Sequence, residues 1–504
     1  MQFNLARILI ESAQRHPDRD FLVVNDQVHS YAEIDLLSGR VAAALRAGGY
    51  EPGAAIGLRL PNSVDFVASY FGLLKAGLVV VPLNPLLSGQ EIAHIAEDAN
   101  LRAMIAAPDD VLLTEYQLPI LTWGEAEGRH PSGDVADLAA SVTDAVVAGA
   151  VHRTDGDDTA VIIYTSGTTG QPKGAELSHL QLFLSARLES EDLGLNTDDV
   201  MLGVLPLFHI FGLSGVLNSA TVHGQSIVLL PRFSTASVLK ASRERRISVI
   251  VGVPTMYVEL LEYGLASADV ATWRVLVSGG APMPQSVIEQ LEAVLPGASY
   301  VEGWGMTETC ASGSLNGGRN PRRVGSIGRP VWGVELAVLD DDQVAGAPDV
   351  VGELLVRGHN VMTGYWNRPD VTADAFHDGW LRTGDLARLD TDGYAYIVGR
   401  VKDLIIRGGY NVYPREIEDV LFTHPAVVQA AIVGRPDERL GEEIVAYVVP
   451  REGHQVTSDE LREYMRARVA PYKYPREVHL IDRLPTTATG KVDKRSLGAP
   501  VDAG

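Results

Sequence analysis

Hydroxyl groups, glycines and one lysine are concentrated in residues 164–174, which read YTSGTTGQPKG and begin where the apolar run AVIIY ends. Glycines let backbone N–H groups approach an anion closely, and Ser, Thr and Lys side chains add donors and positive charge. This composition predicts a loop that binds phosphate groups. The G-x-x-x-x-G-K-[ST] spacing of a P-loop is absent, and the competing interpretation is a solvent-exposed Ser/Thr/Gly linker.

Three later stretches carry groups that could contact a nucleotide: GWGMTET (303–309), the segment 379–418 and PTTATGK (485–491). They supply an aromatic ring, a hydroxyl, two carboxylates and two cations on Trp304, Thr307, Glu308, Asp385, Arg400 and Lys491. We expect Asp385 on a tight turn, where an aspartate can serve the turn alone. Lys491 alone could equally be a solvated lysine. The prediction of a nucleotide site therefore rests on the combination of these groups and not on any one of them.

Apolar runs followed by glycine-rich loops and helical patterns place these motifs in an α/β fold. AVIIYTSG (160–167) leads into GAELSHLQLFLSARL, and WRVLVSGGAPMP (273–284) leads into QSVIEQLEAVL. Such runs indicate βαβ units with parallel sheets. Ligands in these folds bind beyond the carboxyl ends of the strands, which is where the loops fall. The stretch 125–159 is polar, rich in alanine and weakly patterned, and we predict a connecting excursion there.

From about residue 325 the pattern changes to short β segments, ELAVLD, GELLVRG and YAYIVGR, which predict a smaller β-rich subdomain. A further unit is expected after Arg400. VVQAAIVG and EEIVAYVVP are predicted strands, and SDELREYMRARV is a predicted helix that begins at Ser458 or Asp459. About 100 residues suffice for a small α+β domain.

Composition restricts the class of protein. The chain has 504 residues, of which 46% are hydrophobic and 21% charged, as in a globular protein of several folding units. The first 20 residues do not resemble a signal peptide, and we find no apolar run of the roughly 18 residues that span a bilayer. Cys310 is the only cysteine, which excludes an internal disulfide and fits a cytoplasmic location.

The net charge of −22 argues against nucleic acid and anionic membranes as partners. Residues 1–401 contain 27 Lys and Arg against 48 Asp and Glu, whereas residues 402–504 contain 15 against 16. The nearly neutral last part suits a separate domain that meets a polyanionic ligand, although a drift in composition between domains would give the same contrast.

Taken together and in this order, YTSGTTGQPKG, GWGMTET, GDL, GRVKDLII and TGK resemble the adenylate-forming superfamily, which includes acyl-CoA synthetases, firefly luciferase and peptide-synthetase adenylation domains. The resemblance covers nearly the whole chain. It implies a large N-terminal AMP-binding domain (1–401) of two βαβ-type subdomains plus a small β-barrel-like subdomain. A smaller, mobile α+β domain (402–504) follows.

The resemblance also implies roles for individual residues toward ATP and Mg²⁺. The phosphate loop corresponds to Thr165, Ser166, Gly167, Thr168, Thr169 and Lys173. The positions around the adenine are Gly280, Ala281, Pro282, Gly303 and Trp304. Thr307 matches a phosphate contact and Glu308 a Mg²⁺ ligand. Asp385 and Arg400 match the ribose contacts. Most relatives have tyrosine in place of Trp304, and an indole can still stack on a base.

The implied reaction has two steps, with coenzyme A as the second substrate. A carboxylate attacks the α-phosphate of ATP beside Lys491, and a thiol then displaces AMP from the acyl-adenylate. Lys402 matches the hinge about which the small domain rotates between the steps. Rotation would replace Lys491 by the segment containing Gly408, Gly409, Tyr410 and Asn411. Plant coumarate ligases have a lysine where this chain has Ile406, so that lysine's role does not transfer.

The stretch LPLFHIFGLSG (205–215) matches the segment that lines the acyl pocket. His209 corresponds to a residue that gates the carboxylate site, although a lone histidine often has only a structural role. Phe211, Gly215 and Met306 are predicted contacts of the acid. Malonate-type synthetases have an arginine where Trp304 stands, so the prediction is an apolar acid, either medium- or long-chain, bulky or aromatic.

The preferred function is thus an AMP-forming acyl-CoA ligase. Its partners would be a carboxylic acid, ATP and CoA, without nucleic acid or an integral membrane segment, and a homodimer is left open. The alternatives are a stand-alone enzyme that loads a carrier protein and an enzyme that runs mainly one half-reaction. A luciferase-like oxygenation would reuse the same site, and a non-catalytic ATP sensor would not need both Lys491 and the hinge.

Overall fold

The computed structural model describes the chain apart from residues 109, 111–117, 124–132, 135–150, 167–171, 266–269, 346–347, 438, 452, 486–491 and 499–504. Residue contacts divide it into two compact units. The first comprises Met1–Glu335 and Val356–Leu381, and the second comprises Leu336–Leu355 and Arg382–Gly504. Lys402 lies inside the second unit, and the expected boundary at 401/402 stays a prediction.

An eight-stranded sheet in the first unit carries the glycine-rich stretch. Its order is β20-β9-β8-β4-β3-β5-β6-β7. The strands are β3 (Ala55–Arg59), β4 (Val79–Pro82), β5 (Ala103–Ala106), β6 (Ile120–Thr122), β7 (Gly133–Asp134), β8 (Thr159–Ser166), β9 (Pro172–Ser178) and β20 (Gly364–Tyr365). Helices α3 (Val64–Ala76) and α4 (Gly89–Asp98) connect β3, β4 and β5. The strands from β8 to β7 run parallel, as predicted for βαβ units, whereas β9 and β20 are antiparallel to their neighbours.

A nine-stranded sheet forms the other half of the first unit, in the order β16-β15-β14-β13-β12-β10-β11-β1-β2. Its strands are β1 (Asp20–Val24), β2 (Gln27–Ser30), β10 (Val200–Gly203), β11 (Ser226–Leu229), β12 (Val249–Gly252), β13 (Val275–Gly279), β14 (Ser299–Trp304), β15 (Ser314–Asn316) and β16 (Arg329–Pro330). The six strands from β14 to β1 are parallel. Their carboxyl ends therefore lie along one edge, where the sequence places the loops of interest.

Several helices accompany these two sheets. They are α1 (Arg7–Arg15), α2 (Tyr31–Ala47), α7 (His179–Asp192), α9 (Ser219–His223), α10 (Thr235–Arg245), α11 (Pro254–Tyr263) and α12 (Gln285–Val294). Val287, Ile288 and Leu291 of α12 join the core beneath the nine-stranded sheet with Leu276 of β13. The predicted strand and helix in 273–295 are confirmed as β13 and α12.

The predicted β-rich stretch after residue 325 forms a six-stranded sheet in the order β18-β17-β19-β22-β21, with β23 on β22. The strands are β17 (Val334–Asp340), β18 (Gln343–Ala345), β19 (Gly352–Gly358), β21 (Phe376–His377), β22 (Trp380–Leu389) and β23 (Ala395–Arg400), and α13 (Pro369–Ala375) lies between β20 and β21 in sequence. The β-rich character of this part is confirmed.

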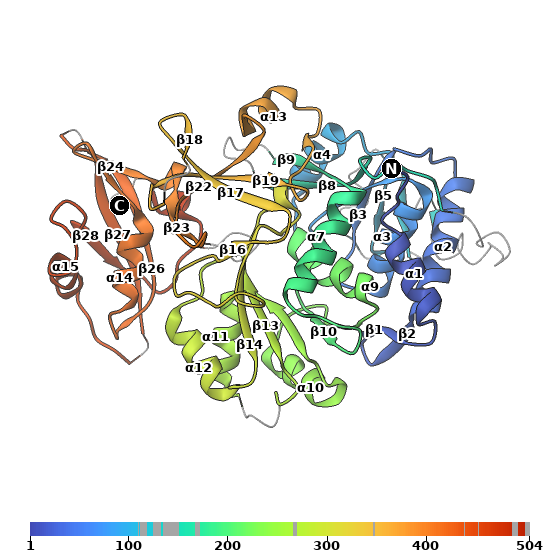
Figure 1. Cartoon of the computed structure of the whole chain (residues 1–504), viewed down its shortest axis with the longest axis horizontal. Coiled ribbons are helices and arrows are strands. Elements are labelled where there is room, and N and C mark those ends of the chain that lie inside the picture. The colour runs from blue at the N-terminus through green and yellow to red at the C-terminus, as the bar shows by residue number, and fades with distance from the viewer. Residues whose placement is uncertain are drawn as a thin grey trace. The chain divides into compact units, whose positions relative to one another are not determined.

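The C-terminal elements of the second unit, orange to red in Figure 1, form an α+β fold. Strands β24 (Ile405–Arg407), β25 (Tyr410–Val412), β26 (Val427–Asp437), β27 (Gly441–Pro450) and β28 (Glu477–Leu480) make one sheet. Helices α14 (Pro414–Phe422), α15 (Ser458–Arg466) and α16 (Lys494–Gly498) accompany it. Ile417, Leu421, Leu461 and Met465 of α14 and α15 are buried against Ile432 of β26.

Two local predictions were wrong, and a third was confirmed. GAELS is not part of a helix: it forms β9, which pairs antiparallel with β8, and α7 starts only at His179. Helix α15 begins at Ser458, as predicted, and is capped by Thr457, whose side chain accepts the Glu460 N–H while Glu460 accepts the Thr457 N–H, because a Thr-x-x-Glu box satisfies two orphan donors. Asp385 lies within strand β22, not on a turn, directly after Gly384 with its φ of 72°.

Most of the excursion predicted for 125–159 lies outside the described residues. Across the described part of the chain, none of the helices combines the length and the apolar character that crossing a bilayer requires.

Candidate active site

The ends of β8 and β9 frame the glycine-rich stretch. Thr165 pairs with Lys173 and Ser166 with Pro172, so residues 167–171 connect two adjacent antiparallel strands. Gly167, Thr168 and Thr169 of the predicted phosphate loop lie outside the described residues. The described flanks place Thr165 and Lys173 beside one another at the carboxyl end of β8, which is the edge at which α/β folds bind ligands.

Lys173 and Glu308 approach the same tyrosine. The Lys173 ammonium lies 5.4 Å from the centroid of the Tyr365 ring, within the range of a cation–π contact. The Tyr365 hydroxyl donates a hydrogen bond of 2.8 Å to Oε1 of Glu308. Burial, and then the negative charge of Glu308, raise the pKa of Tyr365 above its ordinary value. The hydroxyl therefore stays protonated and donates.

Glu308 belongs to a short 3₁₀ turn, η2 (Thr307–Thr309), that follows β14. Thr307 and Glu308 are both buried. The Glu308 carbonyl accepts the N–H of Met362 at 2.8 Å, and the Thr309 hydroxyl accepts the N–H of Met306 at 3.0 Å. These bonds fix the backbone that presents the two predicted phosphate and metal contacts.

The donor set around Glu308 fits magnesium held largely by a substrate. Within the described residues, no group of three or more His, Cys, Asp or Glu side chains could hold a metal. Mg²⁺ prefers hard oxygen ligands and is often bound by one or two carboxylates together with phosphate oxygens. One buried, oriented carboxylate beside a predicted phosphate loop satisfies that chemistry.

The predicted adenine positions meet at the ends of two adjacent strands. Gly279 of β13 pairs with Gly303 of β14, so Gly280, with its φ of 81°, follows one strand end while Trp304 completes the other. Ala281 and Pro282 are exposed beyond Gly280, whereas Trp304 is partly buried. A Cβ added at Gly313 would lie 2.6 Å from Cζ3 of Trp304. The indole therefore packs directly on this backbone.

Phe211 is held between glycines from two different elements. A Cβ built at Gly279 would lie 3.0 Å from Cζ of Phe211, and one at Gly215 would lie 3.1 Å from its Cδ2. His209 caps the helical turn α8 (Ile210–Gly212): its Nδ1 accepts the Phe211 N–H at 3.2 Å. The chain thus brings the predicted acid contact Phe211 next to the β13–β14 edge that carries the predicted adenine positions.

The segment after α8 is a π-helix, η1 (Leu213–Asn218), which continues directly into α9. π-helical turns are rare and occur frequently at functional sites. Gly212 before it has no room for a side chain, because any Cβ would collide with the Pro206 carbonyl. Neither feature was predicted from the sequence, since the apolar pattern of this stretch does not distinguish π from α winding.

In the second unit, Asp385 and Arg400 form an ion pair with 2.8 Å between Nε and Oδ1. They are opposite residues in the β22–β23 ladder. Asp385 is buried, while the Arg400 side chain is about half exposed. The two predicted ribose contacts are therefore brought together.

Gly408 and Gly409 form the two-residue loop between β24 and β25. Their φ angles are 59° and 82°, and positive φ at both central residues is the requirement of a type I′ turn, which favours glycine. The turn alone explains both glycines. Asn411 and Tyr410 are exposed after it, and Tyr410 stacks on Tyr472 with ring centroids 4.6 Å apart.

Lys402 is exposed in the 3₁₀ turn η3 (Val401–Asp403) between β23 and β24. Lys491 lies outside the described residues, but the chain on both sides of it is anchored. The Asp493 N–H donates to the Pro485 carbonyl at 2.8 Å. Three residues beyond Lys491, Lys494 forms a 2.6 Å ion pair with Glu418.

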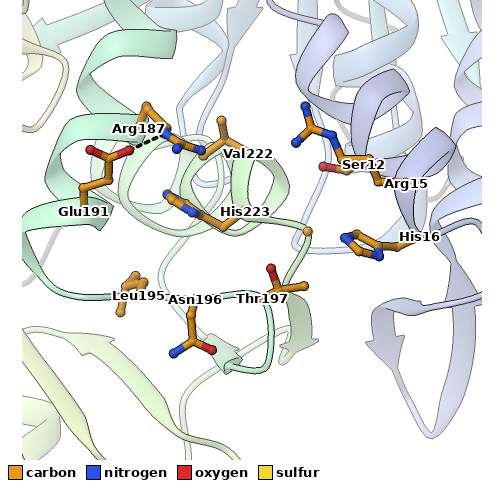
Figure 2. A pocket seen from close by; sticks show the side chains of 11 residues that line it. Ser12, Arg15, His16, Arg187, Glu191, Leu195, Asn196, Thr197, Val222 and His223 are labelled. Carbon is orange, nitrogen blue, oxygen red and sulfur yellow. Dashed lines mark hydrogen bonds and ion pairs between the residues drawn. The ribbon is translucent and has the colours of Figure 1, made fainter.

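A surface cavity of about 380 Å³ lies apart from all these residues (Figure 2). It is lined by Ser12, Arg15, His16, Arg187, Glu191, Leu195, Asn196, Thr197, Val222, His223 and Gly224. Figure 2 shows Arg187 directed at Glu191, and the two are 2.6 Å apart. Arg15 is likewise paired with Glu11. Because its two arginines already have carboxylate partners, we do not assign the cavity to the reaction.

Comparison with known proteins extends this picture. Residues 9–366 match the family model described as AMP-binding enzyme, and residues 416–491 match AMP-binding enzyme C-terminal domain. A feruloyl-CoA synthase of an Amycolatopsis species is 36% identical over 92% of both chains. A sulfoacetate–CoA ligase of Cupriavidus necator is 36% identical over 98% of this chain and 97% of its own. ATP-bound MatB from Rhodopseudomonas palustris has a similar structure, with a TM-score of 0.90, 31% identity and 98% of both chains covered.

The fold and these matches define the class as AMP-forming acid–CoA ligases. The chain belongs to the AMP-binding enzyme family, in the adenylate-forming superfamily, and is of the acyl-CoA synthetase type. The predicted family and fold class are confirmed.

Sequence reasoning missed Tyr365. It lies in a two-residue strand that joins the edge of the eight-stranded sheet. The surrounding letters MTGYW show neither strand alternation nor a helical period, so only the paired positions of Lys173 and Glu308 reveal it.

Proposed function

We propose that this ligase adenylates an apolar carboxylic acid and then transfers the acyl group to coenzyme A. The observation that carries the proposal is the meeting of Lys173 and Glu308 at Tyr365. A cation beside a glycine-rich strand end and a buried carboxylate on a neighbouring turn are the groups that an ATP–Mg²⁺ complex needs. A site for an uncharged ligand would gain nothing from that pair.

In the first step, a carboxylate oxygen of the acid attacks the α-phosphorus, and pyrophosphate leaves. Two anions must approach, so the barrier falls mainly through positioning and charge neutralisation. Thr165, Ser166, Lys173 and the loop 167–171 hold the β- and γ-phosphates in this proposal. Lys491 neutralises charge between the carboxylate and the α-phosphate. Glu308 would bind Mg²⁺, which supplies further charge neutralisation when bound.

Asp385 accepts hydrogen bonds from the ribose hydroxyls, with Arg400 as a donor to the same sugar. The adenine binds between the Gly280–Pro282 loop and Trp304. Both assignments rest on the family's motifs and are supported by the pairing of Asp385 with Arg400 and of Gly279 with Gly303. The same contacts serve ATP and the acyl-adenylate, since both contain adenosine.

In the second step, the CoA thiol attacks the acyl carbonyl of the adenylate. A thioester forms, the thiol proton is lost, and AMP leaves with the bonding electrons. Lys402 is the proposed hinge for residues 402–504, and the segment from Gly408 to Asn411 lines the approach of the pantetheine arm. Because the β24–β25 turn accounts for both glycines, the exposed Tyr410 and Asn411 are the better probes of this role.

Identity to relatives does not decide the acid, because ligases named for feruloyl-CoA and for sulfoacetate are equally similar at 36%. The proposal of an apolar acid rests on Phe211, which packs against Gly215 and Gly279. A sulfonate or second carboxylate buried there would need a cation, and Trp304 occupies the position of the arginine in malonate-type synthetases. His209 and Met306 complete the proposed contacts of the acid.

Pyrophosphate release over a panel of acids, with and without CoA, tests this function. We expect release with aromatic or medium- to long-chain acids and its acceleration by CoA, with AMP and acyl-CoA as products. Release only with sulfonated or dicarboxylic acids would contradict the apolar pocket. Adenylate formation without any CoA product would instead favour the alternative, an enzyme that loads a carrier protein.

A further inference from the structure

Tyr365 is fixed by its backbone next to the strand that carries Lys173. It pairs with Ala175 of β9 across the β9–β20 ladder. The next residue, Trp366, donates its N–H to the Gly174 carbonyl at 2.8 Å. The Tyr365 N–H itself is bound by the Thr372 hydroxyl at 2.9 Å. The ring therefore starts from a rigid position at the edge of the sheet.

The same short segment also holds the turn that carries Glu308. Met362 donates its N–H to the Glu308 carbonyl at 2.8 Å, and the Tyr365 hydroxyl donates to Glu308 Oε1, also at 2.8 Å. Backbone and side chain of Glu308 are thus both tied to residues 362–365. Lys173 lies over the ring of this tyrosine. The Tyr365 side chain thereby links the Lys173 ammonium of β9 to the Glu308 carboxylate of η2.

We propose that Tyr365 is a positioning residue that orients Glu308 for the metal of the ATP complex, an inference that rests on the proposed function. A carboxylate on a buried turn could otherwise rotate about its terminal torsion, which is broad for a Glu side chain. The phenol hydrogen bond selects one orientation. Partners that hold a metal ligand in this way typically contribute 10- to 100-fold in metal affinity or activity.

The hydroxyl and the ring make separable contributions. Tyr365→Phe removes the bond to Glu308 but keeps the ring beneath Lys173. Tyr365→Leu removes both. The first variant should therefore change only the metal-dependent part of ATP binding, whereas the second should also weaken binding of metal-free ATP through the displaced lysine.

The measurement is the dissociation constant of ATP by calorimetry, once in Mg²⁺ and once in EDTA. For Tyr365→Phe we expect the gain in affinity given by Mg²⁺ to fall about tenfold or more, with metal-free ATP bound as tightly as by the wild type. Tyr396→Phe is the matched control. Its hydroxyl also donates to a carboxylate, Asp390, at 3.1 Å, but that carboxylate has no proposed role.

A merely structural hydroxyl would give a different result. If Tyr365→Phe lowered affinity equally with and without Mg²⁺, or left the Mg²⁺ gain intact, the positioning role would be wrong. Wild-type protein that bound ATP without any dependence on Mg²⁺ would overturn the inference too. If that protein also released no pyrophosphate with any acid, the proposed function would fail with it, so the two failures are distinguishable.

Discussion

The ammonium group of Lys494 lies 2.6 Å from Oε1 of Glu418, and the same oxygen accepts the N–H of Ile432 at 2.8 Å. The side chains of Lys494 and Glu418 are 25% and 14% exposed. The Tyr447 hydroxyl adds a hydrogen bond to the Leu497 carbonyl at 3.0 Å. Helix α16 is therefore anchored on the sheet of the second unit, directly after the proposed catalytic lysine.

This anchor sets an upper limit of about 11 Å on the distance from Lys494 to Lys491, because three residues span no more than that as extended chain. We expect Lys494→Met to slow adenylate formation about tenfold or more while thioester formation from supplied acyl-adenylate is kept. Loss of a hydrogen bond to a charged group corresponds to about 1.5–3 kcal/mol. Pyrophosphate release and thioester formation are measured separately. Lys491→Ala should show the same split more strongly, and equal loss of both steps in Lys494→Met would argue against the anchor.

Asp385→Ala should weaken the binding of ATP and of acyl-adenylate together, since both contain the ribose that Asp385 is proposed to bind. The lost hydrogen bonds to a charged acceptor predict about 1.5–3 kcal/mol, or roughly ten- to a hundredfold. Calorimetry with ATP and with a stable adenylate analogue measures both. Asp349→Ala provides the control, because Asp349 also pairs with an arginine, Arg388, at 2.6 Å, but on an exposed surface. Unchanged affinity in Asp385→Ala would refute the ribose assignment.

Gly215→Ala should narrow the range of accepted acids. Its methyl group would lie 3.1 Å from Cδ2 of Phe211, so the ring must shift. A methylene-sized change in an apolar pocket is worth about 10- to 200-fold in selectivity. This change in selectivity is measured as the ratio of kcat/KM for large acids to kcat/KM for small acids. Gly297→Ala adds a methyl group with nothing within 4 Å and should leave the ratios unchanged. If both variants kept the selectivity of the wild type, the acid would have to bind away from Phe211 and Gly215.

Stability should fall between pH 6.5 and about 4 because of His179. Burial lowers the pKa of His179 to about 4, with a smaller opposing effect of Asp158, and its Nδ1 accepts the Leu5 N–H at 3.1 Å. A histidine whose pKa is depressed by folding stabilises the fold above its unfolded pKa, and this contribution is lost as the pH falls toward the folded value. This lowering of the His179 pKa corresponds to about 3 kcal/mol of folding free energy.

Urea unfolding of the wild type and of His179→Gln at several pH values tests this. The non-titrating variant should lose less stability on acidification than the wild type does. His454→Gln is the control, because His454 is exposed, and its unfolding free energy should follow the wild type. Parallel pH curves for wild type and His179→Gln would contradict the assignment.

The sequence was sufficient to predict the parts of the fold that repeat a simple period. The apolar stretch in 273–279 followed by an amphipathic helical pattern was predicted correctly and corresponds to β13 and α12. The same logic failed at β9, since a glycine-rich loop looks alike whether a helix or a returning strand follows. The segment GAELS alternates weakly, and only pairing with β8 decides its conformation.

Long-range contacts account for what the sequence could not predict about the site. Asp385 and Arg400 are fifteen positions apart, and their ion pair depends on the register of β22 and β23. Tyr365 and Glu308 are 57 positions apart and meet because edge strand β20 of one sheet lies beside the turn that follows β14 of the other. Motifs predict which side chains carry chemistry, whereas register and sheet order determine which of them touch.

The π-helical turn η1 has a consequence for how this family member could change its acid. An α-helix rotates by about 100° per residue, and a π-helical turn accommodates one residue more than an α-helical turn. Rewinding Leu213–Asn218 as an α-helix at unchanged length would rotate Phe211 and His209 by roughly that angle relative to α9, whereas deleting one residue as well would keep their orientation. Selectivity can thus shift through the winding of one turn, with every proposed acid-contacting side chain unchanged.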